Sequence, residues 1–195
     1  MRARPRLYFI RHGETDWNAE GRLQGQHDIP INEKGRVQAG EAGRRLAALR
    51  PDLGALPWLV SPMGRTRETA ELGRGAVGLD PAGYTVDERL KEISFGLWEG
   101  YTWKEVRKAE PAMARLREQD KWNFVPPDGE SYGMLMERVR PWLDSLTEET
   151  VAVSHGGVAR AVMRLVTGMS AAEAASADIW QGKVLVFEAG AYRWV

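Results

Sequence analysis

The sequence contains no cysteine, and this absence excludes several kinds of chemistry. Disulfides, thiolate nucleophiles and cysteine metal ligands all need a residue that the chain does not have, and the cytoplasm is the expected compartment. No apolar stretch approaches the roughly 20 residues of a membrane-spanning helix. The apolar run at 7–10, behind a basic opening segment, is too short for the core of a signal peptide. We therefore expect no membrane partner.

Net charge is also lacking, because 27 Lys and Arg side chains stand against 27 Asp and Glu side chains. A balanced chain has no overall attraction for nucleic acid or for an anionic membrane, so a charge-dependent function requires a local cluster. The eight tryptophans are not accompanied by a basic stripe. We therefore expect no nucleic-acid partner.

Common nucleotide-binding and hydrolase motifs are missing as well. Neither G-x-x-x-x-G-K-[ST] nor G-x-G-x-x-G occurs, and no two aspartates lie two positions apart. The segment Ala-Val-Ser-His-Gly at 152–156 resembles a nucleophile elbow, but no histidine follows His155, and that class places its triad histidine after the serine. The histidines show neither H-x-x-x-H nor H-E-x-x-H spacing, so the sequence offers no metal site.

The chain does contain an alternation of short apolar runs and amphipathic segments. This pattern predicts strands at 7–11, 57–61 and 151–154 and one or two strands within 183–195, with helices between them. One helix is expected from the N-cap Asn32 to about Leu49, with Val37 on its apolar side, and Pro141 is expected to kink or split a helix over 131–146. The predicted fold is a three-layer α/β/α sandwich with a mostly parallel sheet, in a single domain over residues 1–195.

Charged residues stand where three of the expected strands end. Arg11 and His12 end the first strand, Arg65 comes shortly after the second, and His155 follows the third. Ligands of open α/β sheets bind beyond the carboxyl ends of the strands, so we expect these side chains to meet at one edge. Two guanidiniums repel a divalent cation, whereas they attract phosphate oxygens and can bind them in bidentate fashion. The pattern favours a phosphate site without a metal.

A histidine is then the candidate nucleophile. A phosphate monoester is close to a dianion at neutral pH and its uncatalysed hydrolysis is extremely slow, so electrostatic stabilisation must supply most of the acceleration. We expect neutral His12 to attack phosphorus while Arg11, Arg65 and a protonated His155 hold the non-bridging oxygens. The arginines favour the neutral form of His12. Gly13 is expected to let the phosphoryl group approach the backbone.

In this order along the chain, a set of motifs resembles the histidine phosphatase superfamily, the phosphoglycerate-mutase-like fold. The set comprises R-H-G-E-T at 11–15, Asn18, GRLQGQHDIPINEKGRVQA, S-P-M-G-R-T-R-E-T-A at 61–70, E-x-x-F-G-x-W-E-G at 92–100, P-P-D-G-E-S, and S-H-G-G at 154–157. The resemblance covers nearly the whole chain.

By this resemblance, Arg11, His12, Arg65 and His155 form the phosphate pocket, and His12 becomes phosphohistidine. Glu92 is implied as the general acid that protonates the leaving oxygen and then deprotonates the attacking water. Further positions match those that line the substrate side of the pocket in the family: Asn18, Gln24, Gly25 and Gly156. No cofactor is implied, and the expected partner is a small phosphorylated metabolite.

Two departures from the mutase pattern favour hydrolysis. Phosphoglycerate mutases of this family carry a basic segment with adjacent arginines between the acid and the last histidine, and here that interval has no such pair. The last turn reads His-Gly-Gly, where mutases usually have asparagine after His-Gly. We therefore predict a phosphomonoesterase. A cofactor-dependent phosphoglycerate mutase and a non-catalytic phosphate-binding protein are the alternatives, and the oligomeric state stays open.

The segment at about 95–130 is expected to be helical and is rich in aromatic residues, namely Phe95, Trp98, Tyr101, Trp103, Trp122 and Phe124. One interpretation is a lid that selects an apolar leaving group; the favoured one is that helices packed over a sheet bury aromatics in any case. We expect His27 to lie in a solvated loop and Glu14 to support the histidine loop.

Overall fold

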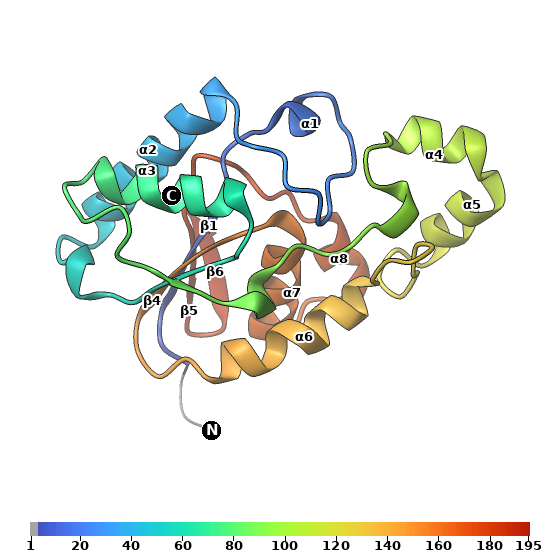
Figure 1. Cartoon of the computed structure of the whole chain (residues 1–195). Helices are drawn as coiled ribbons and strands as arrows, with labels where there is room; N and C mark the ends of the chain where they lie inside the picture. The colour runs from blue at the N-terminus through green and yellow to red at the C-terminus, as the bar shows by residue number, and fades with distance from the viewer. Residues whose placement is uncertain (1–3) are drawn as a thin grey trace.

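A computed structural model describes residues 4–195 and contains a six-stranded sheet with the strand order β3-β2-β4-β1-β5-β6 (Figure 1). The first three residues of the basic opening segment lie outside the described residues. The strands β1 (Leu7–Arg11), β2 (Trp58–Val60), β3 (Thr85–Val86) and β4 (Thr150–Ser154) are parallel. The strands β5 (Leu185–Glu188) and β6 (Ala191–Trp194) add an antiparallel pair at one edge. The prediction of a mostly parallel α/β sheet is confirmed.

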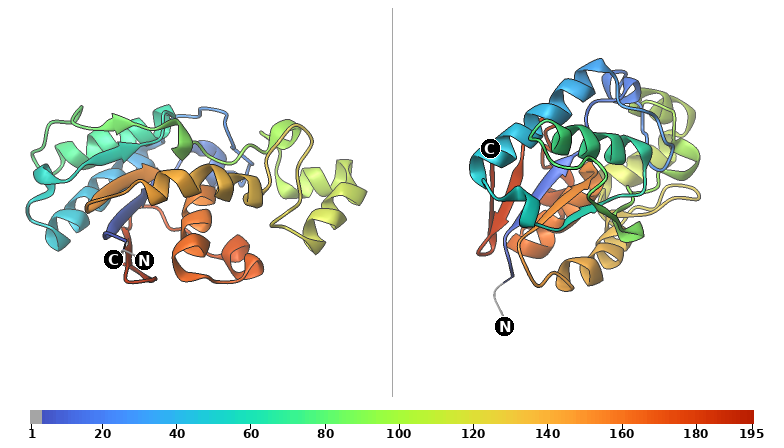
Figure 2. Two further views of the ribbon diagram at one scale, coloured as in Figure 1. Left: turned by 90° about the horizontal axis from the view of Figure 1, so that it is seen from below. Right: turned by 60° about the vertical axis from the view of Figure 1, so that its left-hand side comes forward.

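Helices cover both faces of this sheet (Figure 2). One face carries α2 (Glu33–Leu49) and α3 (Gly64–Gly75), and the other carries α6 (Tyr132–Asp144), α7 (Gly156–Thr167) and α8 (Ala171–Ser176). Successive side chains of a strand point to opposite faces. In β1, Leu7 and Phe9 therefore pack with α6 and α7, while Tyr8 and Ile10 pack with α2 and α3. This division produces the predicted three layers.

The segment between β3 and α6 extends to one side of the sheet (Figure 1). It contains the short helices α4 (Trp103–Ala109) and α5 (Pro111–Gln119) and two 3-10 turns, Glu88–Leu90 and Gly96–Trp98. A separate small hydrophobic cluster forms here around Leu23, Trp98 and Val106. The remaining elements are the four-residue helix α1 (Asp16–Ala19) and the 3-10 turn Leu53–Ala55.

One residue of the predicted helices was misplaced, and one of the two outcomes expected at Pro141 is absent. Val37 is 59% exposed, because the buried side of α2 is the stripe Gly35, Ala39, Ala42 and Leu46, whose spacing of three or four residues follows the helical repeat. Val37 lies two residues from Gly35, about 200° around the helix axis from the middle of that stripe. The expected split at Pro141 is also absent: α6 runs through this residue and ends three residues later, at Asp144.

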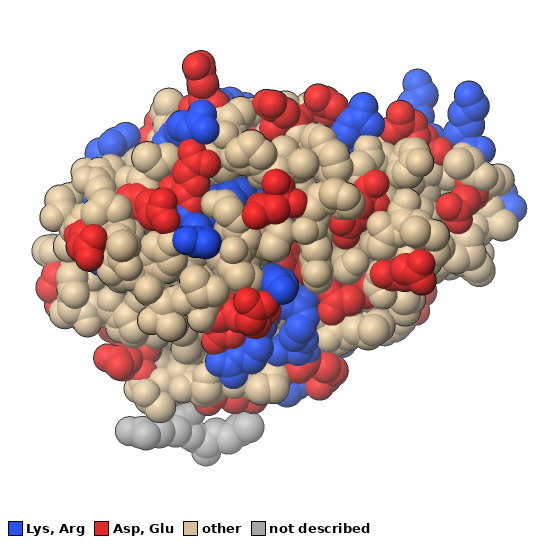
Figure 3. Space-filling view, viewed as in Figure 1, with Lys and Arg blue, Asp and Glu red and all other residues tan. Residues whose placement is uncertain are grey.

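The surface carries both signs of charge. Lys and Arg side chains alternate with Asp and Glu side chains over the face shown in Figure 3. This mixture agrees with the zero formal net charge of the sequence. Within residues 4–195, no helix combines the length and the apolar character that crossing a membrane would require.

Candidate active site

The ends of three neighbouring parallel strands place the predicted residues at one edge of the sheet. After β1, the backbone N–H of His12 donates to the carbonyl of Ser154 at 3.0 Å. After β2, the N–H of Ser61 donates to the carbonyl of Val153 at the same distance. The sheet pairing thus continues for one residue beyond each strand. It brings the rings of His12 and His155 within 5.2 Å of each other, measured between their centroids.

His12 is held as a neutral imidazole with one nitrogen available. Its side chain is buried, with 3% of the residue exposed, and Nδ1 lies 2.8 Å from the carbonyl oxygen of Gly13. A carbonyl can only accept, so Nδ1 carries the hydrogen and Nε2 keeps its lone pair. Burial, followed by the positive charges of Arg65 and Arg11, holds the pKa of His12 well below its ordinary value. Burial and the two positive charges therefore explain why His12 is neutral, as expected from the sequence.

The loop after His12 is clamped against α2, and this corrects the role expected for Gly13. A β-carbon on Gly13 would collide with the backbone carbonyl of Gly35, so the missing side chain makes room for α2 and not for a phosphoryl group. The N–H of Gly13 donates to Thr69 Oγ1 at 3.0 Å, and the carbonyl of Glu14 accepts from the N–H of Asn32 at 2.8 Å. Glu14 therefore supports the histidine loop through its backbone.

The two arginines of the cluster, Arg65 buried and Arg11 half-buried, keep free N–H groups. Arg65 has no exposed surface, and its two terminal nitrogens donate to the carbonyls of His27 at 2.7 Å and Gly25 at 2.6 Å. Arg11 donates from Nη1 to the carbonyl of Ile179 at 2.8 Å. Burial lowers the pKa of Arg11 to about 10, so the guanidinium stays charged at neutral pH. The Nε–H groups of Arg11 and Arg65 have no hydrogen-bond partner among the described residues.

The loop that holds Arg65 is itself organised by a buried carboxylate, that of Glu99. Its oxygens accept from the N–H groups of Gln26, His27 and Phe95 at 3.0 to 3.1 Å. They also lie 2.6 Å from Nδ1 of His27. The His27 side chain is 60% exposed, as expected for a solvated loop, yet this contact anchors it. Glu99 therefore fixes the carbonyls that orient Arg65.

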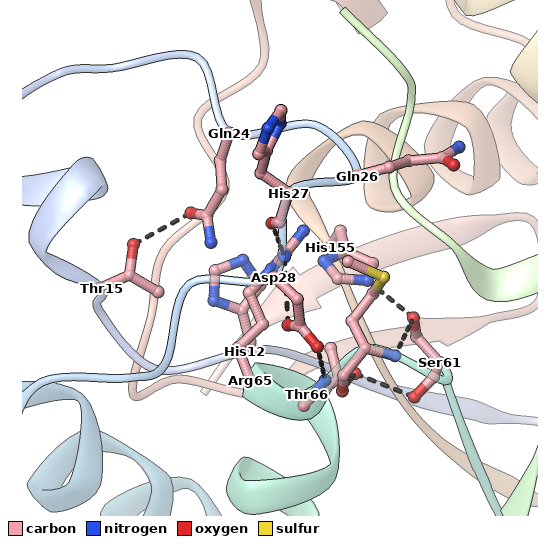
Figure 4. A network of polar contacts seen from close by, with 12 residues as sticks. His12, Thr15, Gln24, Gln26, His27, Asp28, Ser61, Arg65, Thr66 and His155 are labelled. Carbon is pink, nitrogen blue, oxygen red and sulfur yellow. Dashed lines mark hydrogen bonds and ion pairs between the residues drawn. The ribbon is translucent and has the colours of Figure 1, made fainter. Parts of the chain in front are cut away.

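Two amide side chains border the same space. Oε1 of Gln24 accepts from Thr15 Oγ1 at 2.9 Å (Figure 4). It also accepts from Asn18 Nδ2 at 3.4 Å. The amide nitrogen of Gln24 is buried and has no partner among the described residues. Gln181 supports this arrangement, since its amide nitrogen donates at 3.0 Å to both the carbonyl of His12 and Oδ1 of Asn18. A buried donor without an acceptor is costly, and a ligand rich in acceptors would satisfy it.

Glu92 is held beside the beginning of α7. Its carboxylate accepts from the N–H of Ile93 at 2.9 Å and from the N–H of Gly157 at 3.0 and 3.1 Å. A β-carbon on Gly157 would collide with this carboxylate, so the glycine is required for the contact. Glu92 therefore lines the same cavity with its orientation fixed by the backbone.

His155 is expected from the sequence to be protonated. It has no exposed surface, and Nε2 lies 2.7 Å from Ser61 Oγ, while Nδ1 has no partner among the described residues. Burial is the largest of the effects that hold its pKa well below the ordinary value, and the positive charge of Arg65 comes next. The positive charge expected on His155 is therefore opposed by its burial and by the neighbouring arginines.

One cavity of about 160 Å³ joins these groups. Eight of the nine residues expected at the site line it, and the ninth, His155, lies buried behind it: the eight are Arg11, His12, Asn18, Gln24, Gly25, Arg65, Glu92 and Gly156. These eight residues combine a neutral imidazole, two guanidiniums, amide donors and a carboxylate. Such a set can bind a tetrahedral oxyanion, attack it and exchange a proton with it.

The chain matches the family model of the histidine phosphatase superfamily (branch 1) over residues 7–195. The chain belongs to this superfamily. A curated relative from Salmonella arizonae, named "Probable phosphoglycerate mutase GpmB", is 36% identical over 170 residues, which cover 85% of this chain and 76% of the relative.

Two solved structures of similar proteins share the histidine phosphatase fold. Bacillus stearothermophilus YhfR has 32% sequence identity and a TM-score of 0.82, and the match covers 97% of this chain and 94% of that one. The mycobacterial glucosyl-3-phosphoglycerate phosphatase Rv2419c has 30% identity and a TM-score of 0.78, with coverage of 95% and 90%.

In this histidine phosphatase superfamily member, several cavity residues were not among the nine predicted site residues: Arg22, Leu23, Ile93, Phe95, Tyr132, Gly157 and Arg160. Arg160 had a detectable signal, because it stands four residues after Gly156 and so shares its helix face. Tyr132 begins a helix distant in sequence and had none. Of the aromatic residues at 95–124, Phe95 lines the cavity, whereas Trp98, Trp103 and Phe124 pack together in the small cluster.

Proposed function

We propose that this chain is a phosphomonoesterase that hydrolyses a small phosphorylated metabolite through a phosphohistidine on Nε2 of His12. The observation that supports this most directly is the pairing of nucleophile and donors. His12 presents an unprotonated nitrogen to a cavity where buried N–H groups of Arg11, Gln24 and Arg65 have no acceptor among the described residues. A phosphoryl group supplies oxygens for these donors and an electrophile for the nitrogen.

In the first half-reaction, Nε2 of His12 attacks phosphorus in line with the leaving oxygen. The new N–P bond forms as the P–O bond to the leaving group breaks, and the electron pair goes to the leaving oxygen. The protonated carboxyl group of Glu92 gives that oxygen its hydrogen. Arg11 and Arg65 stabilise the charge on the non-bridging oxygens, so the reaction needs no metal ion.

In the second half-reaction, water attacks the phosphohistidine. The carboxylate of Glu92 takes a proton from this water, the N–P bond breaks, and inorganic phosphate leaves. His155 contributes as a neutral ring whose Nε2 lies 2.7 Å from Ser61 Oγ and whose Nδ1 has no partner among the described residues. The proposal places the ring hydrogen on Nδ1, where it binds a phosphoryl oxygen. The same machinery supports mutase chemistry when a substrate hydroxyl replaces water, and the relative from Salmonella arizonae favours that second candidate.

The test combines three measurements on the purified protein. Phosphate release is measured over a panel of phosphomonoesters and ranked by kcat/KM, which measures discrimination directly. After brief reaction with substrate, mass spectrometry without acid treatment should find one phosphoryl group on His12. Acid treatment should remove this group, because phosphohistidine is labile in acid. The His12→Ala variant should retain its fold and lose turnover. An active His12→Ala enzyme would overturn the mechanism.

Two other outcomes would favour the alternatives. Rapid transfer between phosphoglycerates that depends on 2,3-bisphosphoglycerate, with negligible phosphate release, would indicate a mutase. Absence of turnover with every ester, together with tight binding of inorganic phosphate, would indicate a non-catalytic binding protein.

A further inference from the structure

A cation that the proposed mechanism does not use lies beside the phosphoryl site. Arg160 of α7 lines the cavity. Its Nη1 and the Nε of Arg11 each lie 3.6 Å from the point where a β-carbon of Gly156 would stand. Both guanidiniums therefore lie beside Gly156. Arg160 is close enough to Arg11 for its positive charge to contribute to the lowered pKa of Arg11.

Arg160 is positioned by neutral partners, which leave its charge uncompensated. Its Nε donates to the carbonyl of Ala177 at 3.0 Å, and Nη1 donates to the hydroxyl oxygen of Tyr132 at 3.4 Å. No carboxylate among residues 4–195 forms an ion pair with it. Nη2 of Arg160 and the hydroxyl hydrogen of Tyr132 are likewise without an acceptor in the described part of the chain. Both groups are available to a ligand.

The surroundings of Arg160 add positive charge. Arg117 of α5 stacks on the Trp103 ring, with its guanidinium carbon 3.6 Å from the ring centroid. Lys121 donates to the carbonyl of Ala175 at 2.5 Å. Burial, with further contributions from Arg160 and then Arg117, lowers the pKa of Lys121 to about 8. These cations are therefore mutual neighbours.

The other cavity arginine provides a contrast. Arg22 also lines the cavity, but its Nε lies 2.6 Å from a carboxylate oxygen of Glu20, and its Nη1 lies 3.6 Å from one of Glu105. Its charge is compensated within the chain. Arg160 has no such partner among the described residues, so an anion that compensates its charge must come from a ligand. Arg11 and Arg65 are already assigned to the phosphoryl oxygens, so this anion belongs to the leaving group.

We propose that Arg160 and Tyr132 form a second oxyanion subsite, and that the preferred substrates are phosphomonoesters whose leaving group carries a carboxylate or a second phosphate. The inference rests on the proposed phosphatase function and names its substrate class. Arg160 binds the oxyanion through Nη2, and the Tyr132 hydroxyl donates a second hydrogen bond. Arg117 and Lys121 contribute attraction at longer range.

The test uses pairs of esters that differ by the second anion. 3-Phosphoglycerate is compared with glycerol 3-phosphate for the carboxylate, and propane-1,3-diol bisphosphate with the monophosphate for the phosphate. The wild-type protein should prefer the doubly anionic member of at least one pair by tenfold or more in kcat/KM. The pair with the larger preference identifies the oxyanion. Absence of a preference in both pairs would overturn the proposal.

Variants then separate a specificity role from a structural one. Arg160→Gln should lower kcat/KM for the preferred ester about ten- to hundredfold, mainly through KM, because a charge-assisted hydrogen bond is lost. The singly anionic ester should change less than threefold. Tyr132→Phe should show a smaller effect of the same kind. Equal losses on both members of a pair would assign Arg160 to the phosphoryl site or to the fold, and would refute the subsite.

A matched control lies one turn further along α7. Arg164 donates to the carbonyl of Met169 and stacks over Trp122, but it does not line the cavity. Arg164→Gln should leave the preference between the two esters intact. If the wild-type protein releases phosphate from none of these esters nor from p-nitrophenyl phosphate, the failure lies with the phosphatase function. Turnover without selectivity would refute the subsite alone.

Discussion

Replacing Glu99 by glutamine tests how Arg65 is held in place. Glu99 does not line the cavity, yet its two oxygens hold the loop whose carbonyls bind Arg65. One oxygen accepts from the N–H groups of Gln26 and Phe95, and the other accepts from His27. Glutamine has one oxygen and one NH₂ group, so it can satisfy one of these sets and opposes the other with its own hydrogens.

The magnitude follows from the bonds that are lost. On the His27 side, the carboxylate makes two contacts, at 3.1 and 2.6 Å. The backbone hydrogen bond to the charged group contributes about 1.5–3 kcal/mol and the contact with the 60% exposed ring at most about 1 kcal/mol, so about 1.5–4 kcal/mol of loop anchoring is removed. The loop then detaches and Arg65 loses its fixed carbonyl partners. Loss of one positioned oxyanion donor lowers kcat by about 10²–10³-fold, and we expect about a hundredfold loss in Glu99→Gln.

The assay is steady-state hydrolysis of p-nitrophenyl phosphate, with thermal unfolding measured in parallel. Glu110→Gln is the control. Glu110 accepts from the indole N–H of Trp98, the residue before Glu99, and has no hydrogen bond to the loop that holds Arg65. The control variant should retain kcat within a few fold. In an Arg65→Lys background, Glu99→Gln should add little further loss, since both changes remove one interaction. Full activity of Glu99→Gln, or additive losses in the double variant, would refute this reasoning.

Three further outcomes are expected. The folded-state pKa values of His12 and His155 lie below the unfolded value of 6.5, so the unfolded chain binds more protons as pH falls below about 6.5. The free energy of unfolding from denaturant titrations should therefore decrease by up to about 1.4 kcal/mol per pH unit for each histidine as the pH falls from 6.5 to 5.5. In His12→Ala this decrease should be smaller. A free energy of unfolding that does not change with pH would contradict the burial argument. Gly43→Ala should lower the free energy of unfolding by about 1–3 kcal/mol, because its β-carbon would collide with the backbone of Gly73. Gly40→Ala in the same helix meets only the flexible end of Arg44 and should be neutral or stabilising by up to about 1 kcal/mol; equal Tm changes in the two variants would contradict the assigned packing. Glu92→Gln should slow esters with poor leaving groups far more than p-nitrophenyl phosphate, and equal slowing would argue against a general acid.

The residues that the sequence located correctly are those carried by short-range signals. Arg11, His12 and His155 stand immediately at the ends of apolar runs, and the known behaviour of parallel sheets was enough to place them together. The same reasoning produced the layers, since strand and helix periods can be recognised without knowledge of neighbours.

The details that the sequence did not provide depend on contacts between distant segments. The role of Gly13 was misjudged because the atom that requires it, the carbonyl of Gly35, comes from another element. Val37 was misplaced on α2 because it is more apolar than the glycines and alanines that allow close helix packing. The charge of His155 depends on its complete burial, which motif and spacing do not specify.

The two ends of the cavity are supported by different parts of the fold. Arg11, His12 and Arg65 lie at or after the ends of strands of the main sheet, whereas Leu23 belongs to the small cluster that supports α4 and α5. Phe95 packs against both the large core and this small one. Substitution of a few aromatic residues can therefore change the end of the cavity around Phe95, while the residues held by the main sheet stay in place. Related proteins that act on different substrates should therefore differ in sequence first around Phe95.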